Sequence, residues 1–224
     1  MDRLHRTRLM FGDRGLERLH NATVMVVGCG AVGSFAIEAL ARSGIGTIVI
    51  VDFDNVDTTN INRQLFALDS TVGQPKVDVA TSRIHDINPT TTVRAYNLFW
   101  DRDTDLDERP DFVIDAIDSV ESKIALARWA SDRKIPIISS MGAALKTDIT
   151  QIQVASLFHT RVCPLASRVR RLARSAQLPD WPVVYSTQPP LPTSGHAKNM
   201  GSLITVTGTF GLMLAGYVIE ELVK

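Results

Sequence analysis

The chain has few cysteines, no excess of charge of either sign and no apolar run at its start. Its two cysteines, Cys29 and Cys163, form no C-x-x-C pair, which argues against a structural zinc site of the usual spacing and favours a reducing compartment. Basic and acidic residues both number 24, so any surface that binds a polyanion has to be local. The first six residues hold no apolar core, and we therefore expect no secretory signal and a cytoplasmic protein.

One long uncharged segment tests the expectation of a soluble protein. Ser202 to Ile219 carries no charged residue and is about as long as a short membrane span. It also contains glycines and threonines, and two glutamates follow it. Thr207, Gly211 and Ala215 stand four residues apart, so they form a small-residue face that another helix can approach closely. We predict a core or dimer helix here and no association with a membrane.

Apolar runs and helical patterns alternate over the first part of the chain. A chain of 224 residues, of which 45% are hydrophobic and 21% charged, suits one globular domain. The alternation predicts an α/β, Rossmann-like fold with a mostly parallel, doubly wound sheet, whose ligands bind at the carboxyl ends of the strands. We predict strands at 23–27, 47–51, 92–96, 112–115 and 136–140, and helices at 31–42, 75–87 and 122–133.

The glycine turn after the first predicted strand indicates a phosphate-binding loop. The strand runs into Gly28-Cys29-Gly30-Ala31-Val32-Gly33-Ser34, and this turn opens a helix. Glycines let the backbone approach phosphate, and a helix N-terminus supplies N–H donors. Asp52 follows the second predicted strand, where a carboxylate can accept hydrogen bonds from ribose hydroxyls. Strand, glycines, helix and spaced acid together predict a nucleotide site.

The polar residues that follow Asp52 favour a triphosphate over a dinucleotide. A nicotinamide dehydrogenase needs only Asp52 in this segment, whereas a triphosphate needs cations near its β- and γ-phosphates. An NAD-binding dehydrogenase or sensor is therefore an alternative of lower rank. The further residues that we assign to the nucleotide are Asp54, Asn60, Arg63, Gln64 and Lys76.

A second acidic strand end supplies a candidate metal ligand. Asp118 lies just beyond the predicted strand 112–115, where a carboxylate can hold Mg²⁺ on the phosphates. Its alternative role is the N-cap of the helix that follows. Asp115 lies closer to the core, and we expect it to be structural.

The pattern of elements changes after residue 140. Strands are predicted at 151–154 and 182–186, an arginine-rich helix at 164–177, an exposed proline-rich loop at 189–195 and a last helix after it. We expect a single domain, with a nucleotide-binding half at 1–140. The half at 141–224 adds C-terminal strands and a helix for the substrate and the dimer.

These motifs together resemble the ThiF-type, ATP-dependent adenylyltransferases that are related to ubiquitin-activating enzymes. Beside the glycine turn, the likeness rests on Asp-Phe-Asp-Asn-Val at 52–56, Asn-x-x-Arg-Gln at 60–64, Val-Gly-Gln-Pro-Lys at 72–76 and Asp-Ala-Ile-Asp-Ser at 115–119. Softer motifs, Thr-Gln-Ile-Gln-Val at 150–154 among them, are similar to the tRNA threonylcarbamoyladenosine dehydratase branch. The similarity runs from about Arg6 to the C-terminus.

The resemblance implies a homodimer that binds ATP and Mg²⁺ and activates a carboxylate by adenylation. It puts residues 28–34 around the phosphates and Asp52 on the ribose, and it assigns the metal and the reacting α-phosphate to Asp118. Arg6 matches the position from which this superfamily sends an arginine into the partner's site. The candidate catalytic residues are therefore Asp118, Arg63, Lys76 and Arg6.

In the dehydratase branch the activated carboxylate belongs to threonylcarbamoyladenosine in tRNA, whose own carbamoyl group closes a ring with loss of water. A tRNA substrate needs a basic surface. Arg168, Arg170, Arg171 and Arg174 spread over one broad face of the predicted helix at 164–177, although a merely solvated face explains them equally well.

Two further alternatives remain open. The chain can instead activate the C-terminus of a small sulfur-carrier or ubiquitin-like protein, whose tail would bind near the loop at 189–199, with a sulfur donor as a further partner. The missing zinc C-x-x-C pair counts against that branch. A nucleotide-binding scaffold without turnover is the last alternative.

Overall fold

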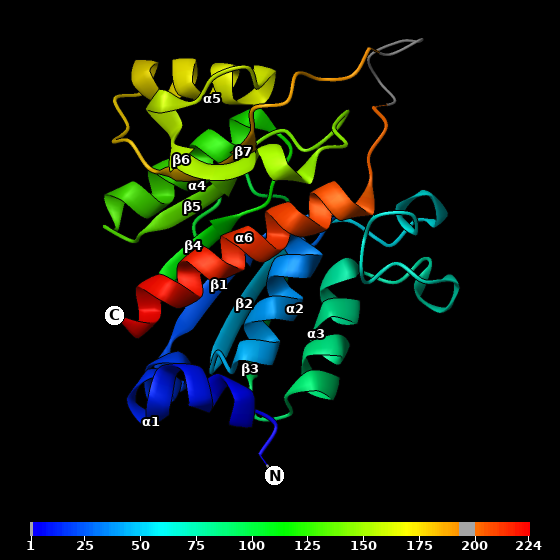
Figure 1. Cartoon of the computed structure of the whole chain (residues 1–224), viewed down its shortest axis with the longest axis vertical. Coiled ribbons are helices and arrows are strands. Elements are labelled where there is room, and N and C mark those ends of the chain that lie inside the picture. The colour runs from blue at the N-terminus through cyan, green and yellow to red at the C-terminus, as the bar shows by residue number, and fades with distance from the viewer. Residues whose placement is uncertain (1, 193–199) are drawn as a thin grey trace.

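The computed structural model describes residues 2–192 and 200–224, in which helices cover both faces of one central sheet (Figure 1). The seven strands of this described part lie in the order β3-β2-β1-β4-β5-β7-β6. All neighbouring strands are parallel except β6 and β7, which are antiparallel. The strands are β1 (Thr23–Val27), β2 (Thr47–Asp52), β3 (Thr92–Asn97), β4 (Phe112–Asp115), β5 (Ile137–Ser140), β6 (Ile152–Ser156) and β7 (Pro182–Ser186).

The helices form two layers, which confirms the predicted doubly wound arrangement. Helices α2, α3 and α6 pack on one face of the sheet, and α4 and α5 pack on the other (Figure 1). Helix α1 lies at the N-terminal end of β1 and contacts α6. The helices are α1 (His5–Asn21), α2 (Gly33–Ser43), α3 (Lys76–Ile87), α4 (Val120–Asp132), α5 (Pro164–Ser175) and α6 (Ile204–Val223).

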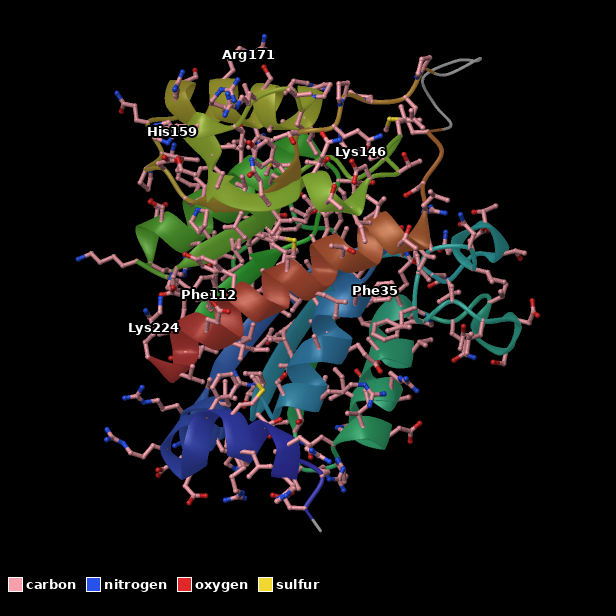
Figure 2. All side chains as sticks on the ribbon, in the orientation of Figure 1. Phe35, Phe112, Lys146, His159, Arg171 and Lys224 are labelled. Carbon is pink, nitrogen blue, oxygen red and sulfur yellow. The ribbon has the colours of Figure 1, made fainter. Side chains whose placement is uncertain are left out.

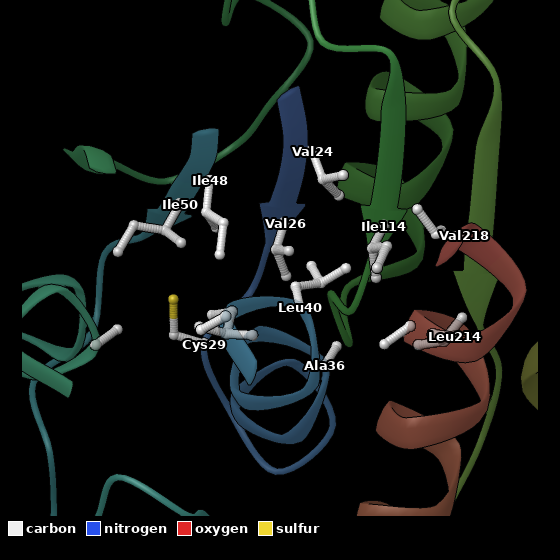
Figure 3. Packing of buried hydrophobic residues seen from close by; sticks show 14 of the residues in the cluster. Val24, Val26, Cys29, Ala36, Leu40, Ile48, Ile50, Ile114, Leu214 and Val218 are labelled. Atoms are coloured by element: carbon white, nitrogen blue, oxygen red, sulfur yellow. The ribbon is translucent and has the colours of Figure 1, made fainter. Parts of the chain in front are cut away.

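The central strands are apolar throughout because both of their faces are buried. In β1, Val24 and Val26 point toward α2 and α6, whereas Met25 and Val27 pack in the core on the side of α4 and α5. Figure 3 shows the first of these cores, where Leu40 of α2 lies beside Val26 and Ile114 of the sheet. This double burial explains why the apolar runs predicted these strands to within two residues at most ends.

Helix α6 is a core helix, and its small-residue face lies against α2. A Cβ atom added to Gly211 would lie 2.3 Å from the carbonyl oxygen of Val32 and 2.8 Å from the Cβ of Phe35, so the two helices need glycine at this contact. The predicted close helix approach is confirmed, and the neighbour is α2 of the same chain (Phe35 is labelled in Figure 2). By length and composition alone α6 could cross a membrane, but 44% of its most apolar window is buried inside the fold.

The strand order determines where the ligand crevice lies. The chain proceeds from β1 to β2 and β3 on one side, and then places β4 and β5 on the other side of β1. Ligands of such sheets bind outside the carboxyl ends of the strands where the order reverses, which is here between β1 and β4. Residues 189–192 of the predicted proline-rich loop have neither helix nor strand, and 193–199 lie outside the described residues.

Candidate active site

A cleft of about 1240 Å³ lies at the carboxyl ends of β1, β2 and β4. Pockets for one small ligand usually have volumes of roughly 300–1,000 Å³, so this cleft has room for a nucleotide and a second substrate. The predicted nucleotide residues that line it are Gly28, Gly30, Ala31, Val32, Asp52, Asp54, Asn60, Arg63, Gln64, Lys76 and Asp118. Residues from five separate segments of the sequence thus meet at the predicted place.

Two glycines give the turn after β1 its shape. Gly28 has a φ of +98°, and a Cβ there would lie 2.7 Å from the carbonyl oxygen of Ala116. A Cβ on Gly33 would lie 1.7 Å from the carbonyl oxygen of Gly28. Only glycine fits at both positions. The tight turn brings the N-terminus of α2 to the cleft, where its free N–H groups can bind phosphate.

Gly33 and Ser34 do not line the cleft, although the sequence assigned them to the nucleotide. Ser34 is fully buried, and its Oγ accepts a hydrogen bond of 3.1 Å from the backbone N–H of Leu65. This bond joins the glycine turn to the segment that carries Arg63 and Gln64. Ser34 therefore links the glycine turn to the segment around Leu65. It does not itself line the cleft.

The carboxylate of Asp52 is held by the backbone. It accepts hydrogen bonds from the N–H of Cys29 at 2.6 Å and from the N–H of Asp54 at 2.9 Å. A carboxylate has about four acceptor positions, so two remain for ribose hydroxyls. Burial, and then the charge of Asp52, raise the pKa of the Cys29 thiol well above its usual range. Cys29 stays protonated and serves as a small residue of the turn.

The two candidate phosphate-binding cations are positioned by neighbours in the same segment. Lys76 is nearly buried, and its Nζ lies 2.7 Å from Oδ2 of Asp54. Arg63 donates from Nη1 to the carbonyl oxygen of Thr59 at 2.7 Å and to Oδ1 of Asn62 at 2.9 Å. A guanidinium has five N–H donors, so Arg63 keeps others for phosphate.

Asp118 does not cap helix α4, and its carboxylate is available to a ligand. The N-cap of α4 is Ser119, whose Oγ accepts from the N–H of Ser122 at 3.3 Å. The carboxylate of Asp118 is exposed to the cleft, and it forms no hydrogen bond with a described residue. No cluster of three His, Cys, Asp or Glu residues occurs in the described ranges. A single carboxylate suits Mg²⁺, because that ion takes its other ligands from phosphates and water.

A buried ion pair holds the turn that presents Asp118. Asp115 and Lys123 are both fully buried, and Nζ of Lys123 lies 3.0 and 3.1 Å from the two carboxylate oxygens. Asp115 also accepts from the N–H of Ile117 at 3.0 Å. These contacts agree with the structural role that we expected for Asp115. The sequence analysis missed Lys123, although its spacing places it on the first turns of α4.

The sequence analysis also missed an aromatic wall beside Asp52. Phe53 follows β2, while Leu98, Phe99 and Trp100 follow β3, and all four line the cleft. The rings of Phe53 and Phe99 meet edge to face with centroids 4.9 Å apart, and both remain about half exposed. An apolar surface next to Asp52 suits a purine ring. The one signal in the sequence was the position of these residues directly after two adjacent strands.

The arginines of α5 divide into two groups. Arg168, Arg171 and Arg174 are exposed, and none forms an ion pair within the described part of the chain. Arg171 is labelled on the outer surface of α5 in Figure 2, and Arg168 lines the cleft. Arg170 differs, because it is partly buried and donates to the carbonyl oxygen of Thr160 at 2.6 Å.

Arg6 lies far from the cleft of its own chain. It is exposed on α1, which precedes the N-terminal end of β1, whereas the cleft lies at the carboxyl end of that strand (Figure 1). No described residue of α1 lines the cleft. Any action of Arg6 on a nucleotide therefore has to take place in another subunit.

Comparison with known proteins identifies the family of the chain. The model of the ThiF family matches residues 3–224, and the chain belongs to that family. Within it, the chain belongs with the tRNA threonylcarbamoyladenosine dehydratases, which confirms the resemblance found in the sequence. It is 44% identical to the enzyme of that name from Bacillus subtilis (strain 168), over 98% of this chain and 94% of the relative.

Two further relatives support the same placement. The tRNA threonylcarbamoyladenosine dehydratase of Haemophilus influenzae is 39% identical, with 93% of this chain and 88% of the relative covered. The structure of Escherichia coli tRNA N6-threonylcarbamoyladenosine dehydratase, TcdA, in complex with ATP has a TM-score of 0.91 to this chain. That comparison has 36% sequence identity and covers 98% of this chain and 93% of TcdA.

Proposed function

We propose that this chain is a cytoplasmic, ATP-dependent tRNA threonylcarbamoyladenosine dehydratase. The observation that carries the proposal is the meeting of a glycine turn, Asp52, two cations and Asp118 in one cleft, in a chain 44% identical to an enzyme of that name. A solved relative with the same fold binds ATP. A nicotinamide enzyme would leave Asn60, Arg63 and Lys76 without a ligand, and we set that alternative aside.

The first chemical step is adenylation of the substrate carboxylate. A carboxylate oxygen attacks the α-phosphorus of ATP, the bond to the β-phosphate oxygen breaks, and pyrophosphate leaves. The α2 N-terminus, Arg63 and Lys76 offset the charge on the phosphates, and Asp52 orients the ribose. Asp118 would hold Mg²⁺, which would supply positive charge to offset the charge that develops on the phosphate oxygens. The work of the protein is positioning and electrostatic stabilisation in a partly closed site.

The second step needs no nucleophile from the protein. The carbamoyl group of the same modified adenosine attacks the acyl carbon, AMP leaves with the former carboxylate oxygen, and a proton is released. The nucleoside has then lost one water, and a ring has formed. This agrees with the burial of both cysteines of the chain.

The experiment that tests the function is mass spectrometry of tRNA nucleosides after incubation with the protein, ATP and Mg²⁺. We expect threonylcarbamoyladenosine to lose the mass of one water molecule only when ATP is present. A reaction without ATP, and a reaction with tRNA that lacks threonylcarbamoyladenosine, set the background. Bound ATP without any change in the tRNA would contradict the proposal and leave a carrier protein, or a scaffold without turnover, as the function.

We further propose that the enzyme is a homodimer in which Arg6 serves the partner's active site. The position of Arg6 at the far end of β1, and the exposed apolar side chains of Leu9 and Met10 on the same helix, support this arrangement. In a dimer these apolar residues would be covered, and α1 would reach a second cleft.

A mixing experiment tests this dimer. Arg6→Ala and Asp118→Ala should each be inactive alone, because each removes one component from every active site. Mixed dimers should regain activity, up to about a quarter of the wild-type rate per subunit, since about half of the dimers are mixed and each has one intact site. The measurement is ATP-dependent conversion of the tRNA nucleoside after equal amounts are mixed. Activity no greater than the sum of the separate variants would contradict the shared site.

A further inference from the structure

One buried lysine of the cleft is not among the residues assigned to the nucleotide. Lys146 lies in the loop between β5 and β6, is only 3% exposed, and lines the cleft together with Gly142, Cys163 and Leu165. Figure 2 labels it between the layer that holds α5 and the start of α6. Lys146 thus belongs to the side of the cleft that the C-terminal half of the chain builds.

The loop that carries Lys146 is fixed by backbone contacts. Nζ of Lys146 donates to the carbonyl oxygen of Gln188, and Oε1 of Gln188 accepts from the N–H groups of Thr147 and Asp148, both at 2.9 Å. Leu145 bonds through its N–H to the carbonyl oxygen of Gly201 at 2.9 Å. The ammonium group is therefore held in one place before any ligand enters.

The charge of Lys146 is not balanced by the protein. Lys76 and Lys123, the other buried lysines, pair with Asp54 and Asp115, whereas Lys146 forms no ion pair with any residue between 2 and 192 or beyond 199. Burial lowers the pKa of the Lys146 ammonium. A buried cation without a counter-charge is unfavourable, and an anion that enters the cleft offsets that cost.

A second feature next to Lys146 also favours an anion. Helix α5 begins at Pro164, close to the loop of Lys146, since a Cβ on Gly142 would lie 3.3 Å from Sγ of Cys163. The N–H of Leu165 donates to no described residue, and Leu165 lines the cleft. The N-terminus of a helix attracts negative charge through its free N–H groups and its dipole.

We propose that Lys146 and the start of α5 form the subsite that binds the substrate's carboxylate before it is adenylated. This inference rests on the proposed function and names the residues that select its acyl substrate. A phosphate of the RNA backbone is the less suitable occupant, because Lys146 is buried, whereas Arg168, Arg171 and Arg174 are exposed. The carboxylate is a small group at the end of the modified base, and it can reach the interior of the cleft that also holds Asp118.

The test compares two RNA stem-loops that differ in one charge. One carries threonylcarbamoyladenosine, and the other carries its methyl ester, which has no carboxylate. Binding is measured with Mg²⁺ and an ATP analogue whose α,β-bridge is methylene, so no pyrophosphate can leave. Wild-type protein should bind the acid about tenfold more tightly than the ester, the usual value of one charged hydrogen bond.

Lys146→Met should abolish the preference for the acid, and Lys146→Arg should retain it. Arg171→Gln is the matched control, because it removes an exposed cation of α5. It should weaken the binding of both stem-loops equally and keep the preference for the acid. In steady-state assays Lys146→Met should raise KM for the tRNA and leave KM for ATP unchanged. Thermal melting of each variant tests whether it is folded. If Lys146→Met does not fold, Lys146→Gln replaces it.

Two results would overturn the assignment. If Lys146→Met still prefers the acid and binds it normally, another group binds the carboxylate. If the substitution weakens the binding of both stem-loops equally, Lys146 binds an RNA phosphate. An unmodified stem-loop separates this inference from the proposed function. Equal binding of modified and unmodified loops by the wild type contradicts the function. A wild type that prefers the modified loop over the unmodified one, but binds the acid and the ester equally, contradicts only the role of Lys146.

Discussion

Replacement of Asp118 by asparagine is expected to lower the rate of pyrophosphate release by about 10³-fold, the usual effect of removing one group that stabilises developing charge. Asparagine keeps the size of the side chain but loses the negative charge that would hold Mg²⁺ on the phosphates. The glycine turn, Asp52, Arg63 and Lys76 remain in place, so ATP should still bind. The measurement is pyrophosphate release with the modified tRNA, together with the Kd for ATP.

Asp103→Asn is the matched control for that variant. Asp103 is an exposed aspartate outside the cleft, and its contact with Arg102 lies at the surface. The same chemical change there should leave both the rate and ATP binding unaltered. A wild-type rate in Asp118→Asn would place the metal elsewhere in the cleft. Loss of ATP binding together with the rate would mean that Asp118 acts on binding rather than on the reacting phosphate.

Lys123→Met is expected to reduce the free energy of unfolding by about 3–5 kcal/mol, because it leaves the carboxylate of Asp115 buried without its partner. Such a loss is a large fraction of the stability of an ordinary domain. The measurement is equilibrium unfolding in urea. The variant should also lose activity, since Asp115 fixes the turn of Ile117 and Asp118 through its hydrogen bond to the N–H of Ile117.

A double variant separates the ion pair from simple packing. Lys123→Met combined with Asp115→Leu removes both charges, so the unfolding free energy should recover much of the loss. Activity should not recover, because leucine cannot accept the hydrogen bond from Ile117. The exposed pair Arg102 and Asp103 serves as a comparison, and Arg102→Met should change stability little. If Lys123→Met were as stable as the wild type, the buried pair would have no energetic role.

The sequence predicted the sheet better than it predicted the first helix. Strands such as β1 and β4 are buried on both faces, so an uninterrupted apolar run marks them. Helix α1 has only Gly15, Leu16 and Leu19 buried, and its backbone leaves helical geometry at Gly12. It therefore has neither a wide apolar face nor an unbroken pattern, and the sequence analysis made no prediction for it.

The site divides in the same way, between what is local in the sequence and what is not. The glycine turn and Asp52 were predictable because a phosphate loop and a strand-end acid are short patterns. Phe99 and Lys146 were not, since they reach the cleft from distant segments and only the fold brings them together. Ser34 contacts Leu65, and Arg170 contacts Thr160. No sequence pattern predicts such partners.

Helix α6 joins two places that the proposed dimer assigns to different active sites. Near its start, Ser202 and Thr207 line the cleft of their own chain. At its other end the carbonyl oxygen of Val223 accepts a hydrogen bond of 2.5 Å from Arg18 of α1, the helix that carries Arg6. The 20 residues of α6 span about 30 Å. Helix α6 therefore connects the cleft of its own chain to the helix whose Arg6 would serve the cleft of the partner.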